Sequence, residues 1–125
     1  MDAIENLDVW KRSCRLSVEV YRLLRDCREL GFKDQITRSA LSVPSNIAEG
    51  YERDSPKEFS RFLRIAKGSC GELRTQLYIG IEAGFIERTQ AKEFIQEATE
   101  IARMIQGLIR HYQTPAILRN SRSTS

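Results

Sequence analysis

Basic residues recur along one segment in the middle of the chain. They are Lys57, Arg61, Arg64, Lys67 and Arg74, and Arg53 lies just before them. Only two acidic residues fall in the same segment, so its excess positive charge equals the formal net charge of the whole chain, +3. Lysine and arginine contact the phosphates of any nucleic-acid sequence, and such binding weakens steeply with salt. The segment therefore predicts a surface for RNA or DNA. Because no aromatic residue is interleaved with the basic ones on their side of the helix, base stacking is not predicted.

A polar group lies on one side of the preceding predicted helix: Ser45, Asn46, Glu49 and Arg53. Antiparallel pairing with the next helix would bring Glu49 close to Arg61 or Arg64, and Asn46 toward the middle of that helix. Two interpretations stay open. The group forms a polar network that fixes the register of the helices, or it forms a contact surface for nucleic acid or protein.

Residues that could support catalysis are sparse. The single histidine, His111, falls in the last turn of a predicted helix, where its cation would favour the helix dipole. Di-iron bundles require Glu-x-x-His pairs, but residue 108 is leucine. No phosphate-binding loop or zinc spacing is present, and no serine has a histidine placed beside it by sequence. Acid–base chemistry by Glu49 and Glu72 alone has no supporting spacing. We expect a protein that is not an enzyme and that needs no metal or cofactor.

Three apolar residues fall outside the predicted core line of the basic helix: Ile65, Tyr78 and Ile79. Apolar residues on the outside of a helix are typical of contacts between proteins. We expect them to form the interface of a homo-oligomer. The alternative is an adaptor that binds another protein and no nucleic acid.

Four amphipathic patterns surround these residues, at 8–30, 35–52, 55–83 and 89–112. Apolar residues spaced three and four apart predict a helix in each. Four such helices joined by short loops bury their stripes in an all-α, antiparallel up-down four-helix bundle. The bundle is expected over residues 1–113, followed by a flexible tail over residues 114–125.

The helix ends are predicted from local signals. Gly31 suits the end of the first helix, Asp34 suits the start of the second, and Pro44 predicts a kink or a break into two pieces. In the third helix Ser55 is the cap, and Glu58 is expected to reach back to the cap N–H. Gly84 is expected to end that helix, and Thr89 to cap the fourth.

Glycines inside the third predicted helix also carry information. Gly68, Gly71 and Gly80 each cost about 1 kcal/mol relative to alanine. We therefore expect a close helix–helix approach at all three positions.

Composition limits the class of protein. A chain of 125 residues is the size of one domain. No apolar run approaches the roughly 20 residues that span a membrane, and the first twenty residues lack a signal-peptide pattern. Cys14 and Cys27, expected on one helix about 20 Å apart, cannot form a disulfide. A reducing, cytoplasmic location is expected.

The stretch SVPSNIAEGYER, followed by SPKEFSRFLRIAKGSCGELRTQL, carries a family resemblance. Together with the opening LDVWKRS, it resembles the four-helix-bundle proteins encoded in intervening sequences of bacterial large-subunit ribosomal RNA genes. The resemblance covers about residues 7–112. More distantly, the chain is similar to the accessory bundle proteins of diversity-generating retroelements, which assemble as pentamers and engage nucleic acid and a reverse transcriptase.

The resemblance implies a non-enzymatic bundle that forms a homopentamer and whose biochemical role is uncharacterised. It also implies RNA or DNA as a partner, or a ribosomal or reverse-transcriptase-like protein. The family pattern falls on the polar group and extends it to further residues, so that the motif comprises Ser45, Asn46, Glu49, Gly50, Glu72 and Gln76.

Overall fold

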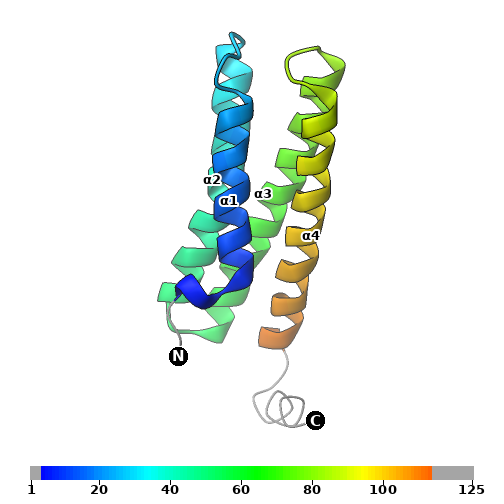
Figure 1. Ribbon diagram of the computed structural model, residues 1–125. Coiled ribbons are helices and arrows are strands. Elements are labelled where there is room, and N and C mark those ends of the chain that lie inside the picture. Colours follow the sequence, from blue (N-terminus) through cyan, green and yellow to red (C-terminus); the bar gives the residue numbers. More distant parts are fainter. Residues whose placement is uncertain (1–3, 114–125) are drawn as a thin grey trace.

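A computed structural model describes residues 4–113, and the predicted tail at 114–125 lies outside these residues. A short 3₁₀ helix, η1 (Ile4–Asn6), precedes four α-helices: α1 (Asp8–Leu23), α2 (Leu30–Glu52), α3 (Pro56–Glu82) and α4 (Arg88–Gln113). The helices run alternately up and down (Figure 1). Within residues 4–113 there is no strand, so the prediction of an all-α antiparallel four-helix bundle is confirmed.

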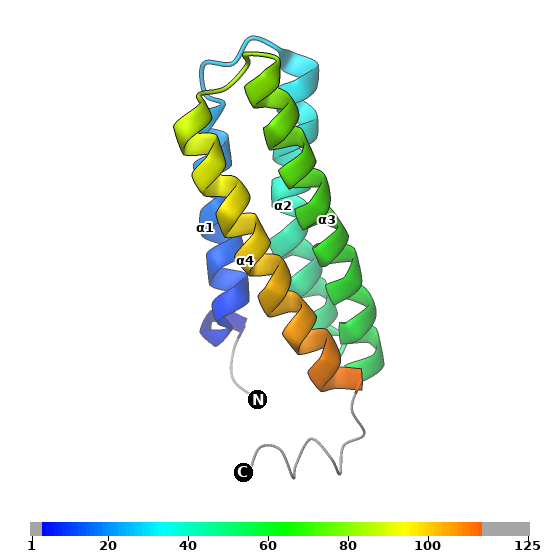
Figure 2. The same ribbon diagram turned by 90° about the vertical axis from the view of Figure 1, so that its right-hand side faces the viewer.

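The helices form a four-cornered bundle in which α3 packs extensively on both α2 and α4. Helix α1 packs on α2 and, less extensively, on α4 (Figures 1 and 2). Each helix contributes fully buried side chains to the shared core, among them Val20, Ile47, Leu73 and Ile101. No helix within residues 4–113 has an apolar stretch long enough to cross a membrane.

The connection between α1 and α2 differs from the prediction. Helix α1 ends at Leu23, and Leu30 is already the first residue of α2. The predicted helix end at Gly31 and the predicted cap at Asp34 are therefore wrong, because both residues lie inside α2. The reason is burial: Leu24 is 0% exposed and holds the turn against the core, whereas Leu30 is 71% exposed. The apolar repeat continues in the sequence beyond the point where it is buried.

Helix α2 passes through Pro44 as one continuous helix, so the expectation of two helical pieces is wrong. Proline lacks the N–H that would bond the carbonyl of Ala40, four residues earlier. In this bundle the Ser17 hydroxyl of α1 lies 2.8 Å from that carbonyl oxygen. A neighbouring helix thus satisfies the acceptor that the proline leaves open.

The ends of α3 follow the local signals closely. The Ser55 hydroxyl accepts from the backbone N–H of Glu58 at 3.3 Å, as predicted. The Glu58 carboxylate does not complete the capping box: it accepts from Arg61 at 3.0 and 3.1 Å instead. At the other end Gly84 adopts a φ of 77°, and Phe85 N–H donates to the carbonyl of Gly80 at 2.8 Å, which is the Schellman pattern.

The start of α4 is capped by a different residue from the one predicted. The side chain of Glu87, not that of Thr89, accepts from the first backbone N–H groups, at 2.9 Å from Thr89 and 2.7 Å from Gln90. These two hydrogen bonds, the one from Gln90 first, hold the pKa of the Glu87 carboxyl below its ordinary value. A carboxylate also suits the positive end of the helix dipole.

Close approach occurs at only one of the three glycines singled out in α3. A Cβ on Gly80 would lie 2.6 Å from Phe32 Cζ, so any larger residue here would force the Phe32 and Ile86 side chains to shift. Gly68 and Gly71 have no atom of another residue within 4 Å of that position, so the expectation is wrong for both. Gly50 of α2 is a second point of close approach, because its Cβ would lie 2.6 Å from Phe62 Cβ.

Candidate nucleic-acid interface

Two basic residues of α3 lie at its seam with α4. Lys67 Nζ donates to Gln106 Oε1 at 2.7 Å, and Arg74 Nη1 donates to Thr99 Oγ1 at 3.3 Å. Both contacts use hydrophilic side chains on α4, so the cations stay at the outer edge of the seam. They fix which residues of the two antiparallel helices stand side by side.

Helix α4 adds cations to the same side of the bundle. Lys92, Arg103 and Arg110 share one side of α4 with Thr99 and Gln106, at spacings of seven, four, three and four residues, and all three are exposed. Arg103 is ion-paired with Glu100 at 2.7 Å. The resulting basic seam comprises Arg64, Lys67, Arg74, Lys92, Arg103 and Arg110. The cations on α4 could not be recognised from the sequence, because no local motif marks them. Only the packing of α3 against α4 brings them beside Lys67 and Arg74.

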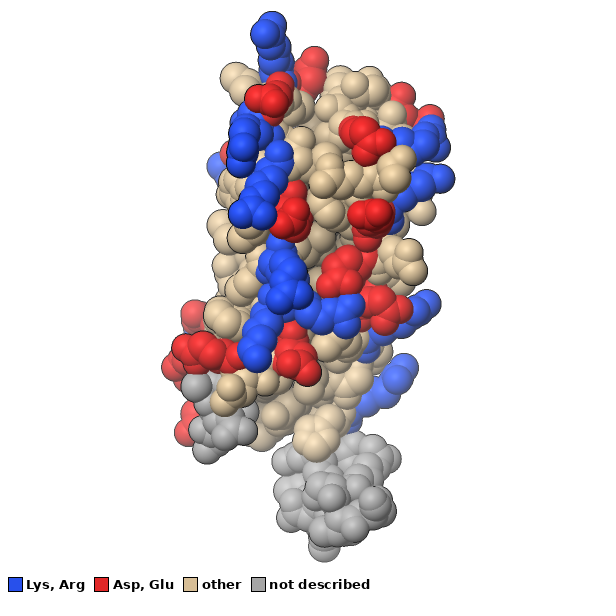
Figure 3. Space-filling view, viewed as in Figure 1, with Lys and Arg blue, Asp and Glu red and all other residues tan. Residues whose placement is uncertain are grey.

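The acidic residues of α4 lie on the side of the helix that faces α1 rather than α3. Glu93, Glu97 and Glu100 form a row on the side of α4 that faces α1. Arg12 of α1 donates two hydrogen bonds to Glu97, at 2.6 and 2.9 Å, and a third to Met104 Sδ at 3.3 Å. Figure 3 shows acidic and basic side chains intermixed on this face, with further basic ones at the α4 edge. Helix α4 is therefore acidic toward α1 and basic toward α3.

Tyr78 belongs to the basic side of α3. It follows Lys67 and Arg74 at intervals of seven and four residues, which places all three in one row along the helix. Its ring is exposed, whereas Ile79, the next residue, is turned by about 100° around the helix. Tyr78 thus lies at the end of this row, one turn beyond Arg74 and outside the segment in which no interleaved aromatic residue was expected.

Arg53 and Arg61 occupy a different place from the basic seam. Both guanidinium groups lie over the ring of Phe62, with Cζ at 5.1 and 4.4 Å from the ring centroid. Each is also ion-paired, Arg53 with Glu49 at 2.8 Å and Arg61 with Glu58 at 3.0 Å. The ion-pair partner of Glu49 is therefore Arg53, one turn away on its own helix, and Arg53 in turn shares the Phe62 ring with Arg61.

Lys57 and Arg64 are exposed on α3. Within residues 4–113, neither has an acidic partner within 4 Å. Arg64 lies one turn from Lys67 and extends the basic seam toward the start of α3. Lys57 lies in the first turn of the same helix.

One residue of the polar motif, Asn46, joins a hydrogen-bond network between α2 and α3. Asn46 Nδ2 donates to Ser42 Oγ at 2.9 Å and to the Ser42 carbonyl oxygen at 2.8 Å. The Ser42 hydroxyl lies 2.8 Å from that of Ser69 in the middle of α3, and Ser69 donates to the carbonyl of Ile65 at 3.2 Å. Asn46 is half-buried, which favours the register-fixing interpretation for this residue.

The other motif residues surround this network in different ways. Glu72 and Gln76 line a groove of about 270 Å³ between α2 and α3, together with Ser42 and Ser69. Gln76 Oε1 is buried and has no hydrogen-bond partner among the described residues. Ser45 is exposed, and Gly50 is the point where α2 meets Phe62.

Two of the three residues proposed for an oligomer interface share a face. Ile65 and Ile79 are 43% and 53% exposed on α3, and Leu41 of α2 is 49% exposed. Tyr78 does not join them, since it lies in the row of Lys67 and Arg74. The exposed apolar side chains of Ile65 and Ile79 therefore lie on α3 away from the row of Lys67, Arg74 and Tyr78.

Groups with the chemistry of a catalytic centre are not assembled in the described part of the chain. His111 is exposed at the end of α4, and its ring contacts Tyr112 edge to face at 4.9 Å. No cluster of three or more histidine, cysteine or acidic side chains within residues 4–113 could hold a metal ion. Burial raises the pKa of the Cys70 thiol to about 12, so it stays protonated inside the core.

Residues 5–107 match the family model of the 23S rRNA-intervening sequence protein. A solved structure from Bacteroides thetaiotaomicron, described as a protein of unknown function from the S23 ribosomal protein family, has the same fold. It shares 27% sequence identity with this chain at a TM-score of 0.76, over 81% of this chain and 97% of that one. No curated protein matches the chain. Neither description names an enzymatic activity.

Proposed function

The chain belongs to the 23S rRNA-intervening sequence protein family, and we propose that it is a non-enzymatic bundle that associates with RNA or DNA through its basic seam. The observation that carries this proposal is the pairing of Lys67 with Gln106 and of Arg74 with Thr99. These contacts align the α3 cations with Lys92, Arg103 and Arg110 of α4. A run of cations along two adjacent helices suits the evenly spaced phosphates of a nucleic-acid backbone.

The seam is suited to phosphates more than to bases. Lysine and arginine side chains at an exposed helix surface neutralise phosphates and displace counterions, without reading the sequence. Arginine can also hold one phosphate by two hydrogen bonds. We therefore expect weak sequence preference and strong salt dependence. Tyr78 supplies one ring in the row on which a base can stack.

The experiment measures binding to a structured ribosomal RNA fragment at low and at high salt, using nuclease-treated protein. Replacing Arg64, Lys67 and Arg74 by glutamate should weaken binding at low salt by roughly tenfold or more and flatten the salt dependence. The control replaces Lys11 and Arg15, two exposed cations on the far side of the bundle, by glutamate. Equal losses per substituted cation in the two variants would show a general charge effect, and unchanged binding in the seam variant would exclude the seam.

We further propose that α3, through Ile65 and Ile79, contacts a second copy of the chain. Exposed apolar side chains on the same face of a helix are typical of contacts between proteins. The family resemblance implies five copies. A light-scattering mass near five subunits, reduced to one by glutamate at Ile65 and Ile79, would support this assembly.

The adaptor remains the second candidate function, because the same apolar face could receive a ribosomal or reverse-transcriptase-like protein. One stoichiometric protein partner, retained after nuclease treatment and lost on substitution of Ile65 and Ile79, would favour it. Retrieval of RNA alone would favour the basic seam.

A further inference from the structure

A second surface with several cations lies on the α1–α2 side of the bundle. It is a hollow of about 430 Å³ lined by Val18, Tyr21, Arg22, Arg25 and Lys33. Helices α1 and α2 stand across the bundle from α3 and α4 (Figure 1). Val18, Tyr21 and Arg22 lie on one side of the end of α1, Arg25 follows two residues after that helix ends, and Lys33 lies in the first turn of α2. Three of the five lining residues are basic, one is aromatic, and none is acidic.

The apolar members of the hollow are open to solvent. Val18 is 48% exposed and Tyr21 is 47% exposed, so the tyrosine side chain is accessible to a ligand in the hollow. Tyrosine rings and guanidinium planes are the surfaces on which unpaired nucleobases stack. A planar, partly apolar ring is therefore the kind of group that this floor can hold.

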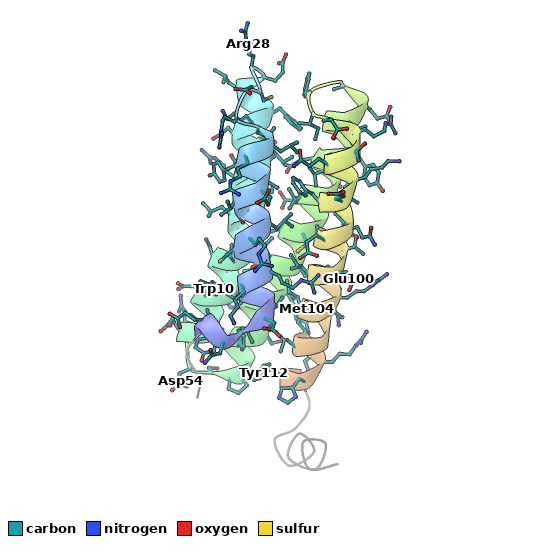
Figure 4. The ribbon with its side chains drawn as sticks, in the orientation of Figure 1. Trp10, Arg28, Asp54, Glu100, Met104 and Tyr112 are labelled. Carbon is teal, nitrogen blue, oxygen red and sulfur yellow. The ribbon has the colours of Figure 1, made fainter. Side chains whose placement is uncertain are left out.

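Arg22, Arg25 and Lys33 line the same hollow as the Tyr21 ring. Lys33 Nζ donates to the backbone carbonyl of Arg25 at 3.5 Å, which holds the lysine at the end of α1. Arg22 is engaged with Glu19 at 3.0 Å, whereas Arg25 and Lys33 have no acidic partner within 4 Å among residues 4–113. Arg28 lies close by at the tip of the α1–α2 connection (Figure 4). Two cations without an acidic partner, in the same hollow as an exposed ring, suit a ligand that carries negative charge next to a flat ring.

We propose that this hollow binds a nucleotide, with its base against Tyr21 and its phosphate between Arg25 and Lys33. The lining residues come only from the last turns of α1, the residues just after it and the first turn of α2. This short span suits one base and its phosphate better than an extended acidic peptide. The ligand is either a free nucleotide or a nucleotide unpaired in a single strand. The site is independent of the basic seam and is on the other side of the bundle.

The test uses the fluorescence of 2-aminopurine, which falls when the base stacks on an aromatic ring. One arm titrates the full chain with 2-aminopurine riboside 5′-monophosphate. The other uses 2-aminopurine within a short oligothymidylate. Quenching in the first arm identifies a free nucleotide as sufficient, and quenching in the second arm alone identifies a strand. Absence of quenching in both arms would overturn the proposal.

Variants distinguish stacking from simple charge attraction. Tyr21→Leu should weaken binding roughly fivefold or more, whereas Tyr21→Phe should keep it. Arg25→Gln with Lys33→Gln should cause a comparable loss, and Arg15→Gln, on the same helix but outside the hollow, should not. Circular dichroism checks that each variant is folded. Binding that is indifferent to Tyr21→Leu, or displaced equally well by inorganic phosphate, would overturn base recognition. An acidic peptide that displaces the nucleotide at lower concentration would do the same.

Binding at the basic seam and binding at the hollow can be tested independently. The variant with Arg64, Lys67 and Arg74 changed to glutamate should retain quenching by the free nucleotide while losing its affinity for structured RNA. Loss of both signals in that variant would show that the hollow is not a separate site.

Discussion

The Ser17 hydroxyl of α1 lies 2.8 Å from the carbonyl oxygen of Ala40 on α2. This carbonyl is the acceptor that an N–H at position 44 would normally fill, and Pro44 has none. The same hydroxyl lies 2.9 Å from the carbonyl of Ser13 on its own helix. The bundle thus tolerates a buried proline in α2 because α1 brings a donor to the open acceptor.

Removing the Ser17 hydroxyl should destabilise the fold, because Pro44 leaves the Ala40 carbonyl without a donor on its own helix. Ser17→Ala leaves the buried carbonyl of Ala40 without a partner, which should lower the free energy of unfolding by about 1–3 kcal/mol. In a Pro44→Ala background, the restored N–H can bond that carbonyl, so the same serine substitution should cost clearly less. Urea unfolding of the four proteins in this double-mutant cycle measures the difference. Equal costs in both backgrounds would show that Ser17 does not compensate for Pro44.

Glycine substitutions in α2 and α3 should have opposite signs. Gly50→Ala places a Cβ at 2.6 Å from Phe62 Cβ, and overpacking of this kind costs about 1–3 kcal/mol. Gly68→Ala meets no atom within 4 Å and gains helix propensity, so it should stabilise the chain by up to about 1 kcal/mol. Thermal or urea unfolding of both variants measures these changes. A loss of stability in Gly68→Ala would mean that another molecule occupies the open space, as at a subunit interface.

The elements that could be predicted are those fixed by neighbours in the chain. The cap at Ser55 and the helix end at Gly84 both depend on residues within one turn, and both occur as expected. The end of α1 depends on tertiary burial: the leucine repeat continues past Leu24, but the core does not. The spacing of apolar residues alone does not show at which residue the repeat stops being buried in the core.

The candidate site was only partly predictable for the same reason. Lys67 and Arg74 are recognisable on α3, but their neighbours Lys92, Arg103 and Arg110 follow from the side-by-side pairing with α4. Arg61 looks equivalent to Lys67 in the sequence, yet its guanidinium is held over Phe62 and by Glu58. A list of cations along one helix does not distinguish these environments.

The network between α2 and α3 predicts a specific contrast between adjacent residues. Asn46→Ala removes two hydrogen bonds to Ser42. It also disturbs the chain of hydrogen bonds that continues from Ser42 to Ser69 and from Ser69 to the Ile65 carbonyl. Since Asn46 is half-buried, we expect a loss of about 1 kcal/mol in the free energy of unfolding. Ser45→Ala is the matched control, because Ser45 is exposed and has no hydrogen bond among the described residues. Equal effects of the two substitutions would argue against the network.

The cap of α4 predicts a dependence of stability on pH. Hydrogen bonds from the backbone N–H groups of Gln90 and Thr89 lower the pKa of the Glu87 carboxyl below its ordinary value of 4.5. A lowered pKa in the folded state means that the ionised carboxylate stabilises the fold above the ordinary value, and that this contribution disappears as the pH falls through the folded-state pKa. Glu87→Gln should therefore unfold at lower urea concentration than the unmodified protein at pH 7. At about pH 2, where the carboxyl is protonated, the two midpoints should converge.

The matched control for that experiment is Glu93→Gln, which removes an exposed carboxylate from the same helix. Glu93 accepts no hydrogen bond from a backbone N–H within residues 4–113, so its substitution should move the urea midpoint little at either pH. A difference between Glu87→Gln and the unmodified protein that stays constant from pH 7 to about pH 2 would contradict the charge-based cap. It would assign the effect to the shape of the side chain, because glutamine keeps an acceptor oxygen in the same place at both pH values.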